Sequence, residues 1–169
     1  DYLVVLEDDL RIDNNFSSTL QEILHYLHSQ KNIEWSLINI AAKKNKISRE
    51  IFRTHDYSLV RAYYFPIRGV GLVWSRQGAH DFLKMAQNPC LPVDIFFQNW
   101  LIKNGKGLSI WPPLVRPAGL DSDILGTVAT ERVRRKQKEN RDFSFFMKKQ
   151  LRLLKNNILA YINFLSFKS

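Results

Sequence analysis

The stretch YLVVLEDD, residues 2–9, joins five apolar residues directly to three acidic ones. A short, continuous apolar run is typical of a strand that is buried on both faces, as in a parallel sheet. Unpaired carboxylates are costly to bury, so the three acids are expected just beyond the strand's carboxyl end. In open α/β sheets, ligands bind in the crevice at that edge. The stretch therefore predicts an α/β protein with an acidic group at its ligand-binding edge.

The rest of the chain alternates between strand-like and helical runs, which indicates the α/β class. Further strands are expected at residues 35–41, 58–66, 70–75 and 108–111. Apolar residues at helical spacing predict a helix over residues 16–27. Two more helices are expected, one capped by Ser75 and one running from Asp94 through Lys103 to a glycine end at Gly105. Residues 43–53 are polar and basic, and we expect a loop there.

The composition excludes several classes of protein. The chain has 169 residues, of which 45% are hydrophobic and 24% charged, so it is neither disordered nor of low complexity. A single cysteine excludes an internal disulfide and a four-cysteine zinc site. No apolar run reaches about 18 residues, so no transmembrane helix is predicted. The chain enters an apolar strand directly after Asp1, and we expect it to begin inside a domain.

The positive charge is concentrated at one end of the chain. The formal net charge is +9, and residues 131–169 hold 11 Lys and Arg against 3 Asp and Glu. Residues 1–130 hold 14 against 13 and are nearly neutral. We therefore expect a catalytic domain over residues 1–130 and a basic linker with an amphipathic helix over residues 131–169. Its apolar stripe and basic flank favour contact with a membrane surface over packing on the body alone.

Glu7 and Asp9 are the candidate metal ligands. They are two residues apart, so in an extended chain their side chains project to the same side and Asp8 to the other. Two carboxylates on one side suit a hard divalent cation and leave positions for phosphate oxygens and water. The alternative is structural, because such acids also cap helices or pair with Lys and Arg.

Asp94 also has two interpretations. It precedes a helical pattern, and Asp is a favoured N-cap, worth about 1 kcal/mol. Its carboxylate would alternatively act as a general base that accepts the proton of an attacking hydroxyl. Lesser candidates are His55, as a metal ligand or a solvated loop residue, and Arg61, Arg68 and Arg76, as phosphate contacts or surface ion pairs.

Several motifs together resemble one known family, the family-25 glycosyltransferases, which include bacterial lipooligosaccharide galactosyltransferases and relatives that glycosylate collagen. Residues 3–9 resemble the family's LEDD signature, residues 71–79 its "AYvisrkGA" segment and residues 92–94 its "PvD". Residues 111–115, followed by residues 121–124, resemble its C-terminal end. The matches occur in the family's order and extend to about residue 125. The family's N-terminal nucleotide-binding stretch has no counterpart here, so the expected domain is the C-terminal portion of the catalytic domain.

The resemblance implies a fold and a chemistry. It implies part of a GT-A-like nucleotide-diphospho-sugar transferase fold, with a mixed, mostly parallel sheet, flanking helices and a basic amphipathic C-terminal helix. It implies Mn²⁺, or Mg²⁺, held at Glu7 and Asp9, and it makes the Asp94 motif the place to look for the base. The remaining motif positions are expected to bind donor or acceptor: Asp8, Gly71, Arg76 and Ser122.

The resulting expectation is an inverting, metal-assisted transfer of a sugar, galactose above others, from a UDP-sugar to a lipooligosaccharide acceptor. The enzyme would lie in the cytoplasm, on the inner face of a bacterial inner membrane, and would bind no nucleic acid. Two alternatives remain open. One is a nucleic-acid-binding module that uses the basic tail. The other is an inactive remnant that acts only by association with a membrane or a partner.

Overall fold

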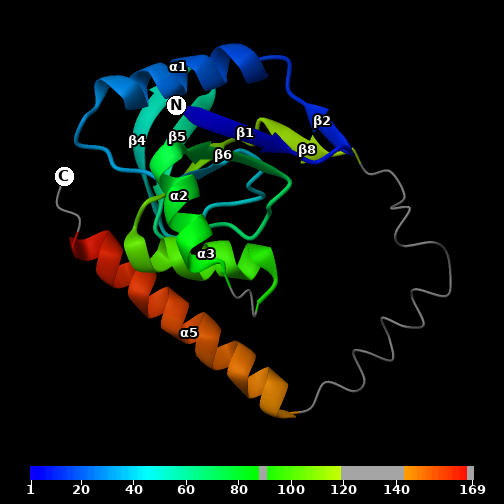
Figure 1. Cartoon of the computed structure of the whole chain (residues 1–169), viewed down its shortest axis with the longest axis vertical. Helices are drawn as coiled ribbons and strands as arrows, with labels where there is room; N and C mark the ends of the chain where they lie inside the picture. Colours follow the sequence, from blue (N-terminus) through cyan, green and yellow to red (C-terminus); the bar gives the residue numbers. More distant parts are fainter. Residues whose placement is uncertain (88–90, 119–142, 167–169) are drawn as a thin grey trace, which may run out of the picture.

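The protein is described by a computed structural model, which covers residues 1–87, 91–118 and 143–166. Its centre is a six-stranded sheet with the strand order β1-β6-β3-β7-β5-β4 (Figure 1). A second, two-stranded sheet pairs β2 with β8. The strands are β1 (Tyr2–Leu6), β2 (Leu10–Ile12), β3 (Leu37–Asn39), β4 (Ser48–Thr54), β5 (Tyr57–Ala62), β6 (Gly71–Ser75), β7 (Gly107–Trp111) and β8 (Val115–Pro117).

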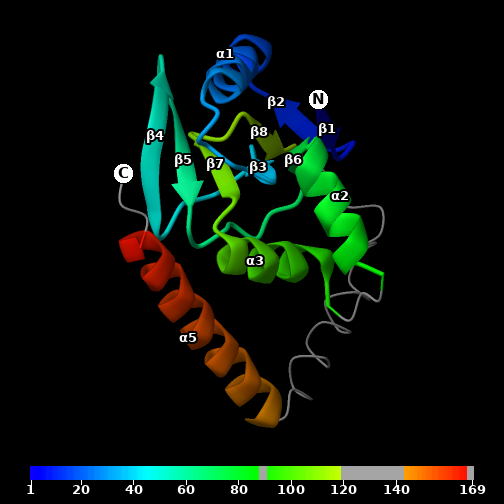
Figure 2. The same cartoon turned by 60° about the vertical axis from the view of Figure 1, so that its left-hand side comes forward.

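Helices cover both faces of the six-stranded sheet. Helix α1 (Phe16–Ser29) packs on one face, against a core cluster that includes Ile38 and Val73. On the other face, Leu37 and Leu72 belong to the core cluster formed with α3 (Val93–Asn104), and α2 (Arg76–Met85) packs beside it (Figure 2). Adjacent residues of a strand therefore belong to core clusters on opposite faces of the sheet, because side chains alternate along a strand.

The predicted α/β class is confirmed, but the expectation of a mostly parallel sheet is wrong. Among the described strands, only β3 and β7 pair in parallel, whereas β1–β6, β6–β3, β7–β5 and β5–β4 are antiparallel. An apolar run shows that a strand is buried, but it carries no information on the direction of the neighbouring strand. That direction depends on the connections: β4 and β5 form a hairpin, while a connection containing α2 and α3 separates β3 from β7.

The first strand is also less buried than its sequence predicts. β1 lies at the edge of the sheet and pairs only with β6 within the described residues. Tyr2 and Leu3 are 55% and 57% exposed. Its apolar run therefore belongs to an edge strand. The expected loop over residues 43–53 is wrong in its second half, because Ser48 begins the long strand β4.

The tail contains one long helix, α5 (Phe143–Ser166), as its apolar spacing predicts. Figure 2 shows α5 running beside α3. Ala160 is fully buried in a cluster with Tyr63, Tyr64 and Ile102. Two asparagines add polar contacts, since the Asn156 amide donates to Asn99 Oδ1 at 2.9 Å and the Asn163 amide donates to the Ile102 carbonyl at 2.6 Å. Within the described residues, no helix is both long and apolar enough to span a bilayer.

Candidate functional site

The three acids form the turn between β1 and β2, here called the acidic loop (Glu7, Asp8 and Asp9). As predicted, they follow the carboxyl end of the strand, and all three are exposed. The backbone anchors the loop at both ends: the Glu7 amide donates to the Val70 carbonyl at 3.0 Å, and the Ala118 amide donates to the Asp9 carbonyl at 2.8 Å. The acidic loop is therefore held between the start of β6 and the end of β8.

Asp94 lies in the first turn of α3 and is not its N-cap. Pro92 occupies the cap position, and no side chain makes a capping hydrogen bond. The capping interpretation is therefore wrong, although a negative charge in the first turn still favours the helix electrostatically. Asp94 is half-buried, and burial raises the pKa of its carboxyl. A carboxylate with a raised pKa is a stronger base, which suits proton abstraction.

The fold brings Asp94 close enough to the acidic loop for their charges to interact. Burial raises the pKa of Glu7, and the negative charges of Asp9, Asp94 and Asp8 raise it further, in decreasing order. Residues 87 positions apart in the sequence thus share one local electrostatic field.

Within the described residues, this concentration of negative charge has no cationic partner. In residues 1–87, 91–118 and 143–166, no ion pair involves Glu7, Asp9 or Asp94. The same residues contain no group of three or more His, Cys, Asp or Glu side chains arranged to hold a metal. The part of the chain that the structure describes therefore offers at most two carboxylate ligands at this place. Oxygen donors of this kind suit Mn²⁺ or Mg²⁺ when phosphate or water completes the coordination.

A short loop ahead of β6 lies against Asp94 and also binds the acidic loop. A β-carbon placed on Gly69 would lie 2.6 Å from Asp94 Oδ1, so glycine permits the loop to pass directly against the carboxylate. The next residue, Val70, accepts the hydrogen bond from Glu7. No local sequence pattern reveals this role of Gly69, because its neighbour in α3 is remote in the chain.

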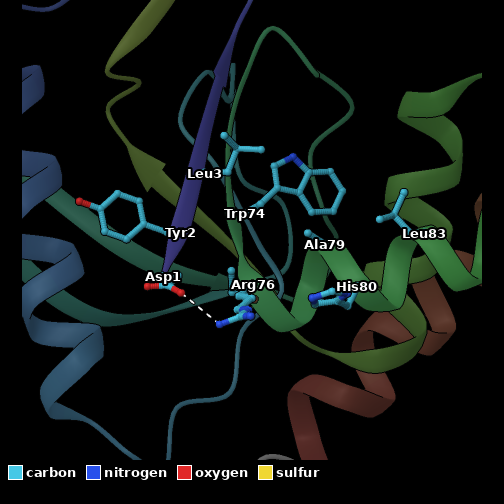
Figure 3. Close-up of a pocket in the computed structure, with 9 residues that line it drawn as sticks. Asp1, Tyr2, Leu3, Trp74, Arg76, Ala79, His80 and Leu83 are labelled. Carbon is cyan, nitrogen blue, oxygen red and sulfur yellow. Dashed lines mark hydrogen bonds and ion pairs between the residues drawn. The ribbon is translucent and has the colours of Figure 1, made fainter.

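Of the other predicted binding positions, Asp8 belongs to the acidic loop, Gly71 begins β6 beside that loop, and Arg76 lies away from it. Gly71 is buried in β6, where a β-carbon would lie 2.4 Å from Val115 Cγ2, so packing explains the glycine. Arg76 lies at the opposite end of β1, where its guanidinium contacts Asp1 at 3.2 Å beside a cavity of about 270 Å³ (Figure 3). Ser122, with the motif at residues 121–124, lies outside the described residues.

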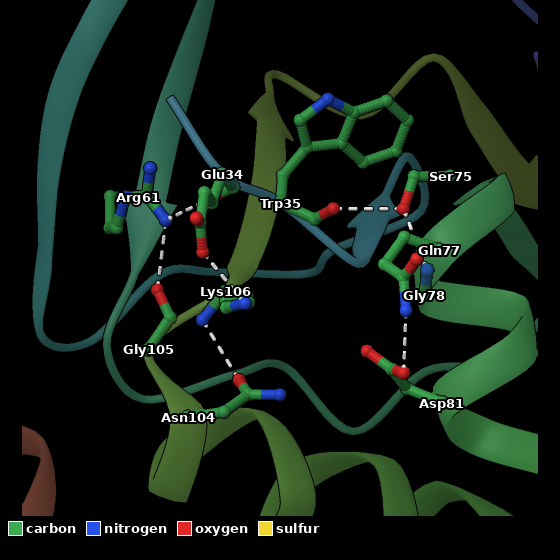
Figure 4. A network of polar contacts seen from close by, with 10 residues as sticks. All are labelled: Glu34, Trp35, Arg61, Ser75, Gln77, Gly78, Asp81, Asn104, Gly105 and Lys106. Atoms are coloured by element: carbon green, nitrogen blue, oxygen red, sulfur yellow. Dashed lines mark hydrogen bonds and ion pairs between the residues drawn. The ribbon is translucent and has the colours of Figure 1, made fainter. Parts of the chain in front are cut away.

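Arg61 has a structural role, and His55 is largely exposed to solvent. The buried Arg61 guanidinium donates to the Glu34 and Gly105 carbonyls, both at 2.9 Å, and so links β5 to the end of α3 (Figure 4). Its interpretation as a phosphate contact is therefore not supported. His55 lies in the β4–β5 turn, on the edge of the sheet opposite β1, and its side chain is 75% exposed. The structure thus confirms the solvated interpretation of His55.

Comparison with known proteins finds one informative similarity. The chain is 36% identical over 97 residues to procollagen galactosyltransferase 1 of Danio rerio. The match covers 55% of this chain and only 15% of that relative. No family model matches the chain, and no solved structure is significantly similar to it. The similarity supports glycosyl transfer in general, in agreement with the family resemblance of the motifs.

Proposed function

We propose that this chain is part of an inverting galactosyltransferase that transfers galactose from UDP-galactose to a lipid-linked oligosaccharide acceptor. The observation that carries the proposal is the convergence of the acidic loop and Asp94, which are distant in sequence and unpaired by cations in the described structure. The similarity to a procollagen galactosyltransferase supports the sugar. The match covers only 15% of that relative, so the activity of the whole protein is itself part of what we propose.

In this proposal, Glu7 and Asp9 hold Mn²⁺ or Mg²⁺. Their carboxylates supply hard oxygen ligands, and their excess negative charge favours a divalent cation. When bound, the cation would stabilise the negative charge that develops on the departing diphosphate. Asp8 would lie at the margin of the donor site, where it adds to the negative potential around Glu7.

Asp94 is proposed as the general base. It would accept the proton of the acceptor hydroxyl while the new glycosidic bond forms and the bond from the sugar to the UDP oxygen breaks. Direct attack from the face opposite the leaving group inverts the anomeric configuration. Partial burial keeps the carboxylate less hydrated, and its raised pKa brings it nearer to the pH at which the enzyme would work.

The proposed location is the inner face of a bacterial inner membrane. α5 packs on the body through one side, and its opposite side presents a stripe of exposed apolar residues. No acidic residue occurs in residues 143–169, and Lys148 and Lys155 flank the stripe. A helix with an apolar stripe and cationic flanks suits the interface of an anionic bilayer. The stripe consists of Met147, Leu151, Leu154, Ile158, Tyr161, Ile162 and Leu165.

The test is the release of UDP from a panel of UDP-sugars, with and without Mn²⁺. Wild-type protein is expected to release UDP from UDP-galactose only with the metal. Asp9→Asn is expected to lower the rate by more than about 100-fold, since even indirect metal partners contribute 10–100-fold. The matched control is Asp56→Asn, which removes one exposed carboxylate at the opposite sheet edge.

Two results would contradict this assignment. Full turnover by Asp9→Asn would remove the acidic loop from the reaction. A wild-type protein without measurable affinity for any UDP-sugar in the presence of Mn²⁺ would favour the alternative of an inactive chain that acts by association. Salt-sensitive binding of single- or double-stranded oligonucleotides, with no UDP-sugar affinity, would favour the nucleic-acid alternative.

A further inference from the structure

A second pocket, separate from the acidic loop, lies where the β3–β4 connection, the β5–β6 connection and α5 meet. Its volume is about 310 Å³. Four cationic residues line it, Lys43, Lys44, Lys46 and Arg68, and none of its lining residues is acidic. The sequence shows the lysines as part of a polar loop, whereas the fold adds Arg68 from a different connection. The pocket is therefore a concentration of positive charge assembled by the tertiary structure.

Within the described structure, these cations are not paired with carboxylates. Across the described parts of the chain, no ion pair involves Lys43, Lys44 or Arg68. Lys46 lies over the ring of Tyr64, with its Nζ 4.5 Å from the ring centre, and it too forms no ion pair among the described residues. Like charges around one cavity repel each other, and a bound anion would offset this repulsion by attracting all of them.

Tyr64 also lines the pocket, and its buried hydroxyl is a potential hydrogen-bond donor. The residue is only 4% exposed, and its hydroxyl has no hydrogen-bond partner among the described residues. Burial raises the pKa of the phenol, so the hydroxyl keeps its proton at neutral pH. Buried polar groups usually have a partner, and an unsatisfied one costs about 1–3 kcal/mol. An acceptor oxygen on a ligand would satisfy this donor.

We propose that this basic pocket binds a phosphoryl group. Lysine and arginine side chains are the usual ligands of phosphate oxygens, and a neutral hydroxyl donor complements them. The pocket adjoins the acidic loop without including it, because Arg68 lines the pocket, Gly69 contacts Asp94 and Val70 holds Glu7. The inference does not require the proposed function. If both hold, a phosphoryl group of the donor or of a lipid-linked acceptor would be bound one loop away from the acids.

Binding of inorganic pyrophosphate, measured by calorimetry without divalent metal, tests the pocket. Lys43→Gln combined with Lys46→Gln is expected to weaken binding at least about tenfold, through loss of two charge-assisted contacts. Tyr64→Phe should weaken it about fivefold, as expected for one hydrogen bond. The matched control, Lys31→Gln combined with Lys84→Gln, removes the same charge from exposed positions outside the pocket and should leave affinity unchanged. Circular dichroism establishes that every variant is folded.

Competition identifies the source of the phosphoryl group. Displacement of pyrophosphate by UDP would indicate the nucleotide donor. Displacement by vesicles of phosphatidylglycerol and phosphatidylcholine, but not by phosphatidylcholine alone, would indicate a lipid headgroup. Either result supports the pocket. Absence of pyrophosphate binding, or equal weakening in the pocket and control variants, would overturn it. Because no metal and no sugar transfer enter this measurement, its failure is distinct from failure of Mn²⁺-dependent UDP release.

Discussion

The backbone of Gly69 lies against the carboxylate of Asp94, so closely that a β-carbon on Gly69 would be 2.6 Å from Asp94 Oδ1. This close approach places the carboxylate beside the loop that also binds Glu7 through the Val70 carbonyl. A methyl group at Gly69 would meet the end of a side chain, which can move. We therefore expect a substitution at Gly69 to affect the proposed reaction more than the stability of the fold.

Gly69→Ala is expected to lower UDP-galactose turnover by about 100-fold, because a displacement of about 1 Å in a reacting group has effects of that size. Its free energy of unfolding should change by less than about 1 kcal/mol, since alanine also reduces the entropy of the unfolded chain. Turnover and chemical denaturation check the two effects. Unchanged turnover in Gly69→Ala would show that the position of Asp94 does not matter for the reaction.

Gly78→Ala provides the contrasting case. A β-carbon there would lie 2.2 Å from the Ser36 carbonyl oxygen, which belongs to the backbone and cannot simply rotate away. We expect a loss of about 1–3 kcal/mol in the free energy of unfolding, as for other overpacked sites. The specific activity of the folded fraction should be retained. A fully stable Gly78→Ala variant would contradict the close helix–strand packing.

Asp94→Asn is expected to lower kcat by about 10²–10⁴-fold, the usual contribution of a general base, with little change in donor affinity. In the wild type, kcat should rise with pH through the raised pKa of Asp94, because only the ionised carboxylate accepts a proton. The pH dependence should disappear in the variant. A pH profile of Asp94→Asn identical to that of the wild type would remove Asp94 as the base.

The stability of the fold should also depend on the ionisation of Glu7 and Asp94. Their contribution to stability should fall as the pH rises, whereas kcat should rise. The folded-state pKa values of Glu7 and Asp94 are raised above their ordinary values of 4.5 and 3.8, so folding favours the protonated forms. Their contribution to stability is present at low pH and is lost as the pH rises through the folded-state pKa values. Glu7→Gln combined with Asp94→Asn should therefore gain stability relative to the wild type as pH increases.

Urea denaturation of both proteins over a pH series measures this difference. Other acids, such as Glu50 and Asp13, have lowered pKa values and act in the opposite direction, but they are common to both proteins. Added Mn²⁺ should stabilise the wild type at neutral pH and not the variant. A difference that does not vary with pH would show that the two carboxyls are not perturbed by the fold.

Arg61→Met is expected to lower the free energy of unfolding by about 1.5–3 kcal/mol, the range for hydrogen bonds to charged groups. Two carbonyls, those of Glu34 and Gly105, would lose the donor that holds them. The control is Arg116→Met at an exposed position, which should change stability by no more than about 0.5 kcal/mol. Loss of pyrophosphate or donor binding without loss of stability would instead identify Arg61 as a ligand contact.

The membrane proposal predicts binding of the chain to vesicles that contain phosphatidylglycerol. Leu151→Gln combined with Leu154→Gln should reduce that binding at least about tenfold, because two exposed apolar side chains would no longer enter the interface. Leu83→Gln combined with Met85→Gln removes two similarly exposed apolar residues from α2 and should have little effect. Equal losses in both variants, or vesicle binding unchanged in the first, would contradict docking through α5.

Much of the local structure follows from residues that are close together in the chain. Apolar spacing located α1 and α5, the Ser75 hydroxyl caps α2 by accepting from the Gly78 amide at 2.9 Å, and Gly105 ends α3 with a φ of 68°. The acids follow β1 as expected. These features arise from interactions within a few residues, which is why a pattern in the chain predicts them.

How these elements combine could not be predicted from local patterns. The antiparallel pairing of most strands, the edge position of β1 and the approach of Asp94 to Glu7 all depend on contacts between distant segments. So does the basic pocket, where Arg68 joins lysines from another connection. The spacing of apolar residues shows which side of a strand or helix is apolar. Which other element packs against that side depends on the packing of the whole chain.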